Sequence, residues 1–299
     1  MKQQVVDFMS DFTIETTPGS AAKIPDYRAH LRPGCAVAVT FLPGSDYRDT
    51  ILTCKRLFDE GFEPVPHFVG RSIPSEHDFI SFLEGVTSEA NVDHVVVLAG
   101  AVDKPLGPYD SSMALLETGL FEKYNIRKIG VAGHPEGNPD IGNKMLSQAL
   151  EFKNNYARTT GTDLYIVTQF VFEAEPIIKW DKAIRLSGIQ LPIHIGIPGL
   201  ASLKALINHA RACGIGASMK FLTRQARNIT KLLNIQSPDK LVMDLARYKA
   251  EDSACGIKKV HMYPLGGMRR SAAYSYALLD GAFDIDAKGT GLKLHNEID

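Results

Sequence analysis

The sequence predicts an α/β fold, a single (β/α)8 TIM barrel over residues 1–299 with extra helices before the last strand. Eight short apolar runs rich in β-branched residues alternate with longer amphipathic segments, which is typical of repeated parallel β–α units. Eight predicted strands are the number that a closed (β/α)8 barrel requires. The main alternative is an open doubly wound sheet, and the first run lacks the Gly-x-Gly-x-x-Gly turn that this alternative favours.

Strands and helices are assigned in chain order from the spacing of their apolar residues. Runs of β-branched and aromatic residues indicate strands, and apolar residues at helical spacing indicate the segments between them. The predicted strands are Phe12–Thr16, Ala36–Phe41, Glu63–Phe68, His94–Leu98, Lys128–Ala132, Leu164–Gln169, Pro192–Ile195 and Lys259–Tyr263. The predicted helices are Asp46–Glu60, Glu76–Glu84, Ser111–Tyr124, Ile141–Ala157, Glu173–Ser187, Ala201–Cys213, Met219–Leu233 and Pro238–Tyr248.

Composition indicates a small-molecule partner. The chain has 33 basic and 34 acidic residues, a formal net charge of -1, so we expect neither a nucleic acid nor a membrane partner. Its four cysteines are widely separated and lack zinc-site spacing, which favours reduced thiols and a cytoplasmic location. No window approaches the roughly 20 apolar residues of a membrane span. Oligomeric state is open, with a homo-oligomer among the possibilities.

The most informative segment runs from Val131 to Asp140, after the fifth predicted strand. Two glycines permit a close backbone approach to a ligand, two prolines stiffen the loop, and His134, Glu136 and Asn138 supply hydrogen-bonding groups. A plain strand-to-helix connection with an N-cap at Asp140 is an equal alternative. The ligand-binding interpretation gains weight because polar residues recur at the ends of other strands, where barrel active sites lie.

Glu15 is the leading catalytic candidate among these strand-end residues. A carboxyl group on an apolar strand loses solvent, which favours the protonated form that a general acid needs. Gln169 offers donors and an acceptor on one amide, which suits the edge of a heterocycle, although a local backbone contact is an alternative. His94 and His194 are expected to be structural, and His261 is equally consistent with either role. We predict no metal site, because the first strand carries no His-x-His pair.

Taken together, these residues resemble those of one enzyme family, the flavin-dependent methylenetetrahydrofolate reductases. The resemblance runs over nearly the whole chain and depends on short motifs in a fixed order on successive strands. The motifs are Glu15-Thr16-Thr17-Pro18, Pro66-His67, His134-Pro135-Glu136-Gly137-Asn138-Pro139, Thr168-Gln169-Phe170 and His261-Met262-Tyr263-Pro264-Leu265.

The resemblance implies a cytoplasmic oxidoreductase that holds FAD in the barrel mouth and passes hydride between NAD(P)H and the folate one-carbon unit. Glu15 would protonate N10 of 5,10-methylenetetrahydrofolate on the way to 5-methyltetrahydrofolate, and Gln169 would bind the substrate pterin. The positions that match cofactor contacts are Thr40, His67, Gly100, Ala101, His134, Asn138 and Lys153, with Lys153 near the diphosphate.

The departures from the family pattern concern the flavin. Typical bacterial members have Arg-Gly-Asp where this chain has Ala99-Gly100-Ala101, and His134, Asn138 and Gly267 replace a tyrosine, a histidine and an arginine. Weaker FAD binding, or binding rebuilt through groups such as Asp103, Lys104 and Arg269, is therefore expected.

Loss of the aspartate charge at Ala101 should raise the flavin potential and favour oxidation of 5-methyltetrahydrofolate, as methyl catabolism requires, unless Asp103 compensates. Two further functions stay open: a folate-linked one-carbon enzyme without tightly bound flavin, and a non-catalytic folate-binding barrel. The non-catalytic barrel is disfavoured, because a protein that only binds folate has little reason to bury the Glu15 carboxyl group.

Overall fold

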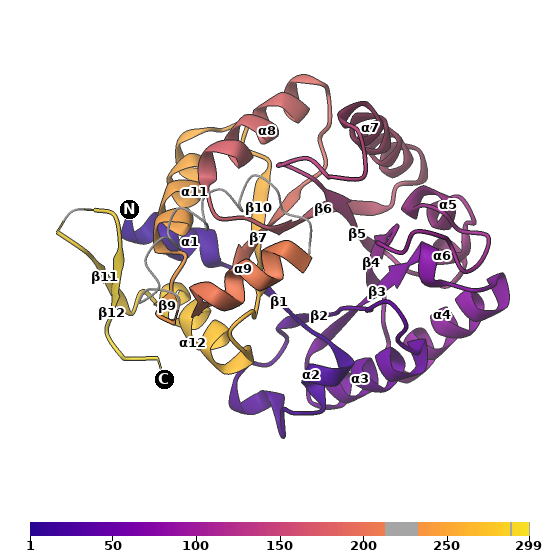
Figure 1. Cartoon of the computed structure of the whole chain (residues 1–299), viewed down its shortest axis with the longest axis horizontal. Coiled ribbons are helices and arrows are strands. Elements are labelled where there is room, and N and C mark those ends of the chain that lie inside the picture. Colours follow the sequence, from indigo (N-terminus) through magenta and orange to yellow (C-terminus); the bar gives the residue numbers. More distant parts are fainter. Residues whose placement is uncertain (213–232, 288, 299) are drawn as a thin grey trace. The chain divides into compact units, whose positions relative to one another are not determined.

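The predicted barrel is present in a computed structural model that describes residues 1–212, 233–287 and 289–298. Within these ranges eight parallel strands close in the order β1-β10-β7-β6-β5-β4-β3-β2, which confirms the fold class (Figure 1). Two small sheets, β8-β9 and β11-β12, are additional to it. The barrel strands are β1 (Thr13–Thr16), β2 (Ala36–Val39), β3 (Glu63–Val69), β4 (His94–Leu98), β5 (Lys128–Gly133), β6 (Asp163–Phe170), β7 (Ile193–Pro198) and β10 (Ile257–Tyr263).

All eight strand predictions are confirmed, and all but two of the helix predictions correspond to a helix of the structure. The segment Ser111–Tyr124 is not one helix, because Gly119 adopts a left-handed conformation with φ 66° and separates two short helices. The predicted helix Met219–Leu233 lies outside the described residues except for Leu233. The helices are α1 (Lys2–Met9), α2 (Pro18–Ala21), η1 (Tyr27–Ala29), α3 (Tyr47–Asp59), η2 (Gly70–Ser72), α4 (Glu76–Ala90), α5 (Ser112–Leu116), α6 (Leu120–Lys123), α7 (Asn143–Thr160), α8 (Ala174–Leu186), α9 (Leu203–Ala212), α11 (Asp239–Glu251) and α12 (Met268–Leu279).

Helices α1 and α12 were not predicted from the sequence. Nor were the strands of the two small sheets, which are β8 (Ala201–Ser202), β9 (Ile235–Gln236), β11 (Phe283–Ile285) and β12 (Leu292–Leu294). These four strands have two or three residues each, too few to establish a period. Among the described helices, none is both long enough and apolar enough to cross a bilayer.

Contacts divide the chain into two compact units. The N-terminal unit comprises Thr13–Ala132 and Ala149–Ile166, and the C-terminal unit comprises Met1–Phe12, Gly133–Gln148 and Val167–Asp299. The expectation of a single domain over residues 1–299 stays a prediction.

Aromatic packing joins strands and helices in the N-terminal unit. Phe68 on β3 stacks on Phe82 of α4, with ring centroids 4.2 Å apart, and also meets Phe79 and Phe121 edge to face. Since all four rings are buried, this face of β3 is the face that the helices cover (Figure 1). Alternate residues of a strand point to opposite faces, so His67 belongs to the other face.

A buried ion pair organises the C-terminal unit. Asp181 on α8 is fully buried and accepts a hydrogen bond from Nε of Arg185 at 3.0 Å. Its other oxygen accepts from the Tyr248 hydroxyl and from the Gly256 amide, each at 2.9 Å. Arg185 also donates to two backbone carbonyls in the loop before β7. The carboxylate therefore connects α8 to α11 and to the start of β10.

Replacing Asp181 by alanine should lower the free energy of unfolding by about 3–5 kcal/mol, because two buried donors and the half-buried Arg185 lose their acceptor. Urea unfolding followed by circular dichroism measures this loss. Glu175→Ala is the matched control on the same helix, since the Glu175–Lys179 pair is exposed and should contribute little. Equal stability of the two variants would contradict the assigned role of Asp181.

Candidate active site

Glu15 and Thr40 meet on one face of the N-terminal unit. Thr16 accepts a hydrogen bond from the Tyr27 hydroxyl at 2.8 Å, so it points toward the helical layer and its neighbour Glu15 points the other way. Glu15 pairs in register with Ala38, whose face Thr40 shares two residues later. The Thr40 hydroxyl donates to Oε2 of Glu15 at 3.1 Å. The proposed acid is thus half-buried near the end of its strand and held by a hydroxyl donor.

His67 lies on the same face. The register pairs Val39 with Pro66, so continuing by one residue sets Thr40 beside His67. His67 is buried, with 7% of its surface exposed, and it precedes the last residues of β3. Three residues predicted from separate strand ends are therefore adjacent in the fold, which supports one site at the carboxyl ends of β1 to β3.

The backbone of the loop after β4 requires a glycine at position 100, the one residue of the family's Arg-Gly-Asp triplet that this chain keeps. Gly100 has φ +97°, and a Cβ there would lie 2.4 Å from Cγ1 of Val69. Ala101, which follows it, is exposed. The backbone of this loop is anchored by Arg71, whose amide donates to the Ala99 carbonyl at 2.9 Å.

Arg71 is a further candidate, which was not predicted from the sequence. Its guanidinium donates to the Asp103 carbonyl at 2.6 Å, and its buried Nε makes no hydrogen bond within the described part of the chain. A positive charge from the end of β3 therefore adjoins the loop that lacks the family's arginine at Ala99. An arginine directly after a strand was the available signal, but its direction depends on the fold.

Lys153 on α7 is a buried cation. Only 4% of its surface is exposed, and its Nζ donates to the Ala132 carbonyl, near the end of β5, at 3.2 Å. Burial lowers the pKa of Lys153 to about 8. No carboxylate of the described residues offsets this cost, so the side chain is suited to an anionic ligand.

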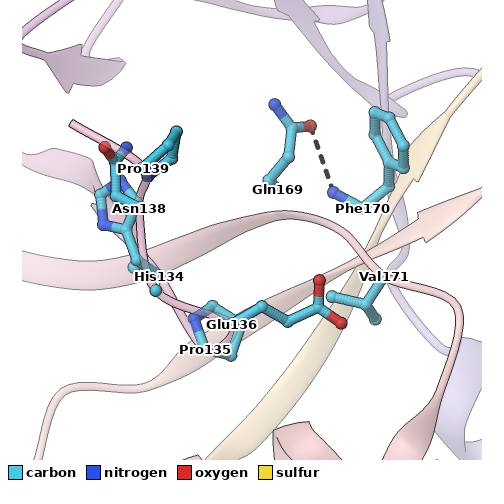
Figure 2. A pocket seen from close by; sticks show the side chains of 10 residues that line it. His134, Pro135, Glu136, Asn138, Pro139, Gln169, Phe170 and Val171 are labelled. Carbon is cyan, nitrogen blue, oxygen red and sulfur yellow. Dashed lines mark hydrogen bonds between the residues drawn. The ribbon is translucent and has the colours of Figure 1, made fainter. Parts of the chain in front are cut away.

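A pocket in the C-terminal unit brings the predicted loop together with Gln169 (Figure 2). It is lined by Gly133–Pro139 and by Gln169, Phe170 and Val171. Oε1 of Gln169 accepts from the Phe170 amide at 3.2 Å, so the predicted local contact exists and leaves the NH2 group of the amide directed away from it. His134, Asn138 and Gln169, predicted from two separate segments, therefore share one pocket.

The loop is shaped by two local hydrogen bonds. The Gly137 amide donates to the His134 carbonyl at 3.0 Å, and Gly137 adopts φ +79°. The Asp140 amide donates to Oδ1 of Asn138 at 2.9 Å. The proposed N-cap at Asp140 is wrong, because α7 begins only at Asn143 and the polar residues of the loop fold into their own turns.

Neighbouring residues hold β6, the strand that carries Gln169, in place. The Tyr263 hydroxyl donates to the Thr168 carbonyl at 2.8 Å, and the Thr168 hydroxyl accepts from the Gly196 amide at 2.9 Å. Phe170 packs in an apolar cluster with Leu203 and Leu206 of α9. These contacts hold Gln169 in place before any ligand binds, which a specific recognition group requires.

His94 is structural, as predicted. Its Nδ1 lies 2.5 Å from Glu63 and its Nε2 lies 2.9 Å from the Tyr165 hydroxyl, at the amino ends of their strands. Burial lowers the pKa of His94, which the Glu63 contact partly opposes. His194 and His261 are each buried, with 4% exposed. Within the described ranges, no group of three His, Cys, Asp or Glu side chains could hold a metal ion.

The sequence model of the methylenetetrahydrofolate reductases matches residues 115–265, about half of the chain. The chain belongs to the methylenetetrahydrofolate reductase family. The matched range contains the pocket loop, Lys153 and Gln169. It begins after Glu15, Thr40 and His67, so the roles predicted for these three depend on their geometry and on the resemblance of their motifs.

Two curated reductases are similar to parts of the chain. Methylenetetrahydrofolate reductase 2 of Saccharomyces cerevisiae is 30% identical over 117 residues, covering 39% of this chain and 18% of that protein. Methylenetetrahydrofolate reductase 1 of Schizosaccharomyces pombe is 27% identical over 146 residues, covering 46% and 22%. The alignments therefore span about a fifth of these relatives.

One solved structure is similar over most of its length. An uncharacterized protein from Clostridium thermocellum, which binds two copies of 5-methyl-5,6,7,8-tetrahydrofolic acid, has a TM-score of 0.54 and 14% identity. The match covers 92% of this chain and 97% of that one. At this identity the likeness concerns the fold.

Proposed function

We propose that this protein is an FAD-dependent methylenetetrahydrofolate reductase that interconverts 5,10-methylenetetrahydrofolate and 5-methyltetrahydrofolate with NAD(P)H. The observation that carries the proposal is Glu15: a half-buried carboxyl group near the carboxyl end of β1, hydrogen-bonded to Thr40. A family barrel that only bound folate would not need an acid there. The Clostridium thermocellum protein of similar fold binds a methylated folate, which supports a folate as the ligand to test.

In the proposed reaction Glu15 gives its proton to N10 of 5,10-methylenetetrahydrofolate. The N10–methylene bond then breaks, the five-membered ring opens, and an iminium forms at N5. The Thr40 hydroxyl orients the carboxyl group and remains bonded to its anion after transfer. Gln169 would bind the pterin through the NH2 group of its amide, because its Oε1 already accepts from the Phe170 amide. In the reverse direction, Glu15 accepts the proton as N10 attacks the iminium.

The chain's own residues fit a flavin dinucleotide. Lys153 is a buried cation with no carboxylate partner among the described residues, which suits a diphosphate, and Arg71 provides a guanidinium beside the loop of Gly100. Thr40, His67, His134 and Asn138 offer polar groups at the strand ends. FAD, when bound, would supply hydride transfer to the folate and accept hydride from NAD(P)H.

An absorption spectrum of the purified protein, repeated during titration with FAD, tests the cofactor, and NADH or NADPH oxidation with methylenetetrahydrofolate tests the reaction. We expect a flavin spectrum and folate-dependent turnover. Folate binding and one-carbon turnover without flavin would replace the proposal by the flavin-free enzyme. Folate binding without any turnover would favour the non-catalytic barrel.

The direction of the reaction is proposed from Ala101. Ala101→Asp should lower the reduction potential of bound flavin, because a carboxylate near the ring disfavours its anionic reduced form. The wild-type potential is then the higher one, which favours oxidation of 5-methyltetrahydrofolate. Equilibration with a reference dye compares both proteins side by side. Equal potentials would contradict this proposal and would point to compensation by Asp103, which is exposed two residues later.

A further inference from the structure

Tyr27 is a fully buried tyrosine whose hydroxyl reaches the last residue of β1, next to the proposed acid. The hydroxyl donates to Oγ1 of Thr16 at 2.8 Å. The backbone carbonyl of Thr16 accepts a hydrogen bond from the Thr40 amide, also at 2.8 Å. Thr16 is therefore bonded to the residue whose own hydroxyl holds the Glu15 carboxyl group. A chain of hydrogen bonds thus leads from Tyr27 to the partner of the acid.

The segment that carries Tyr27 is attached to α3. Glu60, at the end of this helix, accepts from the Tyr27 amide at 2.8 Å and from Nε of Arg56 at 2.7 Å. Arg56 also donates to the carbonyls of Ala21 and Ile24, at 2.9 and 2.6 Å, and its guanidinium lies 5.3 Å from the centroid of the Tyr27 ring. Helix α2, in the same segment, contacts α3 (Figure 1). Contacts with α3, rather than with β1 alone, therefore set the position of the Tyr27 hydroxyl.

The carboxyl end of β1 needs such support because the strand is short. β1 comprises only Thr13–Thr16, and Glu15 is its next-to-last residue, where strands fray most readily. Neighbouring side chains of a strand point to opposite faces, so the direction of Glu15 depends on that of Thr16. Burial raises the pKa of Tyr27, so the phenol stays protonated, and therefore a donor, at neutral pH. The Tyr27 hydroxyl fixes Thr16 on the helical face and thereby holds Glu15 on the opposite one.

We propose that Tyr27 is a positioning residue for the acid: through Thr16 it holds the end of β1 so that the Glu15 carboxyl group meets the folate in a fixed direction. This inference rests on the proposed function, in which Glu15 protonates N10. Because Tyr27 is fully buried, it acts on the reaction through Thr16 and not by contact with the substrate. Proton transfer depends steeply on the geometry of donor and acceptor, so a small change in direction lowers turnover.

Tyr27→Phe tests the role of the hydroxyl alone. Phenylalanine keeps the ring and its edge-to-face contact with Phe62, whose centroid lies 6.2 Å away. With folate and FAD at saturating concentrations, we expect turnover to fall about 3–10-fold, the effect of one lost hydrogen bond. The folate dissociation constant should stay within about twofold, because the change affects the acid rather than the binding groups. Steady-state turnover and equilibrium folate binding measure the two quantities separately.

Tyr165→Phe is the matched control for a loss of stability. Tyr165 is also buried, and its hydroxyl lies 2.9 Å from Nε2 of His94, near the amino ends of β6 and β4. Glu15 lies at the carboxyl end of its strand. Both variants should lose a similar amount of stability in urea, but Tyr165→Phe should keep wild-type turnover. Equal losses of turnover in the two variants would overturn the positioning role, since a general loosening of the fold would then account for both.

Thr16→Val tests the path from Tyr27 to the acid. Valine cannot accept the Tyr27 hydroxyl, so this variant alone should lower turnover by a similar factor, and adding Tyr27→Phe should cause little further loss. Losses that multiply, or unchanged turnover in Tyr27→Phe, would overturn the inference. Folate-dependent turnover of the wild type would still leave the proposed function intact. Absence of that turnover in the wild type would overturn both.

Discussion

Glu15→Gln should lower the turnover of methylenetetrahydrofolate by about 10²–10⁴-fold, the range for removal of a general acid. Glutamine keeps the shape of the side chain and can still bond to Thr40, so the folate dissociation constant should change little. Steady-state turnover and direct folate binding measure the two quantities separately. A fall in turnover with unchanged binding is the pattern for a group that acts in the reaction itself.

Thr40→Val provides a graded comparison at the same place. Valine matches threonine in size and removes the hydroxyl that donates to Glu15. With FAD at saturating concentration, turnover should fall less than about tenfold, because one positioning hydrogen bond is lost while the acid remains. Unchanged turnover in Glu15→Gln would refute the proposed acid. Equal losses in both variants would indicate that the Glu15–Thr40 contact is structural, since removing the proton donor should cost far more than removing its partner.

The strand ends could be predicted because they depend on local sequence. Apolar β-branched runs identify the strands, and in a barrel of parallel strands the residue type at each carboxyl end then predicts the site. Glu15 and Thr40 follow from this argument although they are 25 residues apart, and their hydrogen bond confirms that they meet. Gln169 and the His134 loop were likewise predicted from separate segments and share a pocket.

Contacts that depend on tertiary structure could not be predicted in the same way. The direction of Arg71 toward the Asp103 carbonyl follows from the path of a loop 32 residues later. The burial of Lys153 depends on how α7 packs near Ala132, although the family resemblance did predict a role for this lysine. Gly119 interrupts a helical pattern that is continuous by periodicity, because a single left-handed residue overrides the pattern.

Lys153→Met should affect stability and cofactor binding in opposite directions. Burial of the ammonium group lowers its pKa from 10.5 to about 8, so at pH 7 the folded state holds a desolvated charge that costs roughly 3 kcal/mol. Methionine keeps the packing of the aliphatic stem without that charge, and it should raise the free energy of unfolding by a large part of this amount. Urea unfolding at pH 7 measures the gain.

The pH dependence of stability tests independently whether Lys153 lowers the free energy of unfolding. Below pH 8 the ammonium group is charged in both states and the full cost applies. Between pH 8 and 10.5 the unfolded chain holds the proton and the folded chain does not. The wild-type free energy of unfolding should therefore rise with pH, by at most about 1.4 kcal/mol per pH unit, the slope for a difference of one bound proton. Lys153→Met should lack this rise. Lys144→Met, an exposed change on the same helix, should leave wild-type stability and its pH dependence nearly unchanged.

Binding of FAD distinguishes a functional from a merely structural lysine. If Lys153 pairs with the diphosphate, its loss should weaken FAD about 10–100-fold, as expected for a charge-assisted contact, even though the unliganded protein becomes more stable. If Lys153 has only a structural role, Lys153→Met should lower the free energy of unfolding. The FAD affinity of the folded protein should then be unchanged. Within the part of the chain that the structure describes, no carboxylate offsets the cost of this buried charge, and the proposed FAD would supply an anion that does.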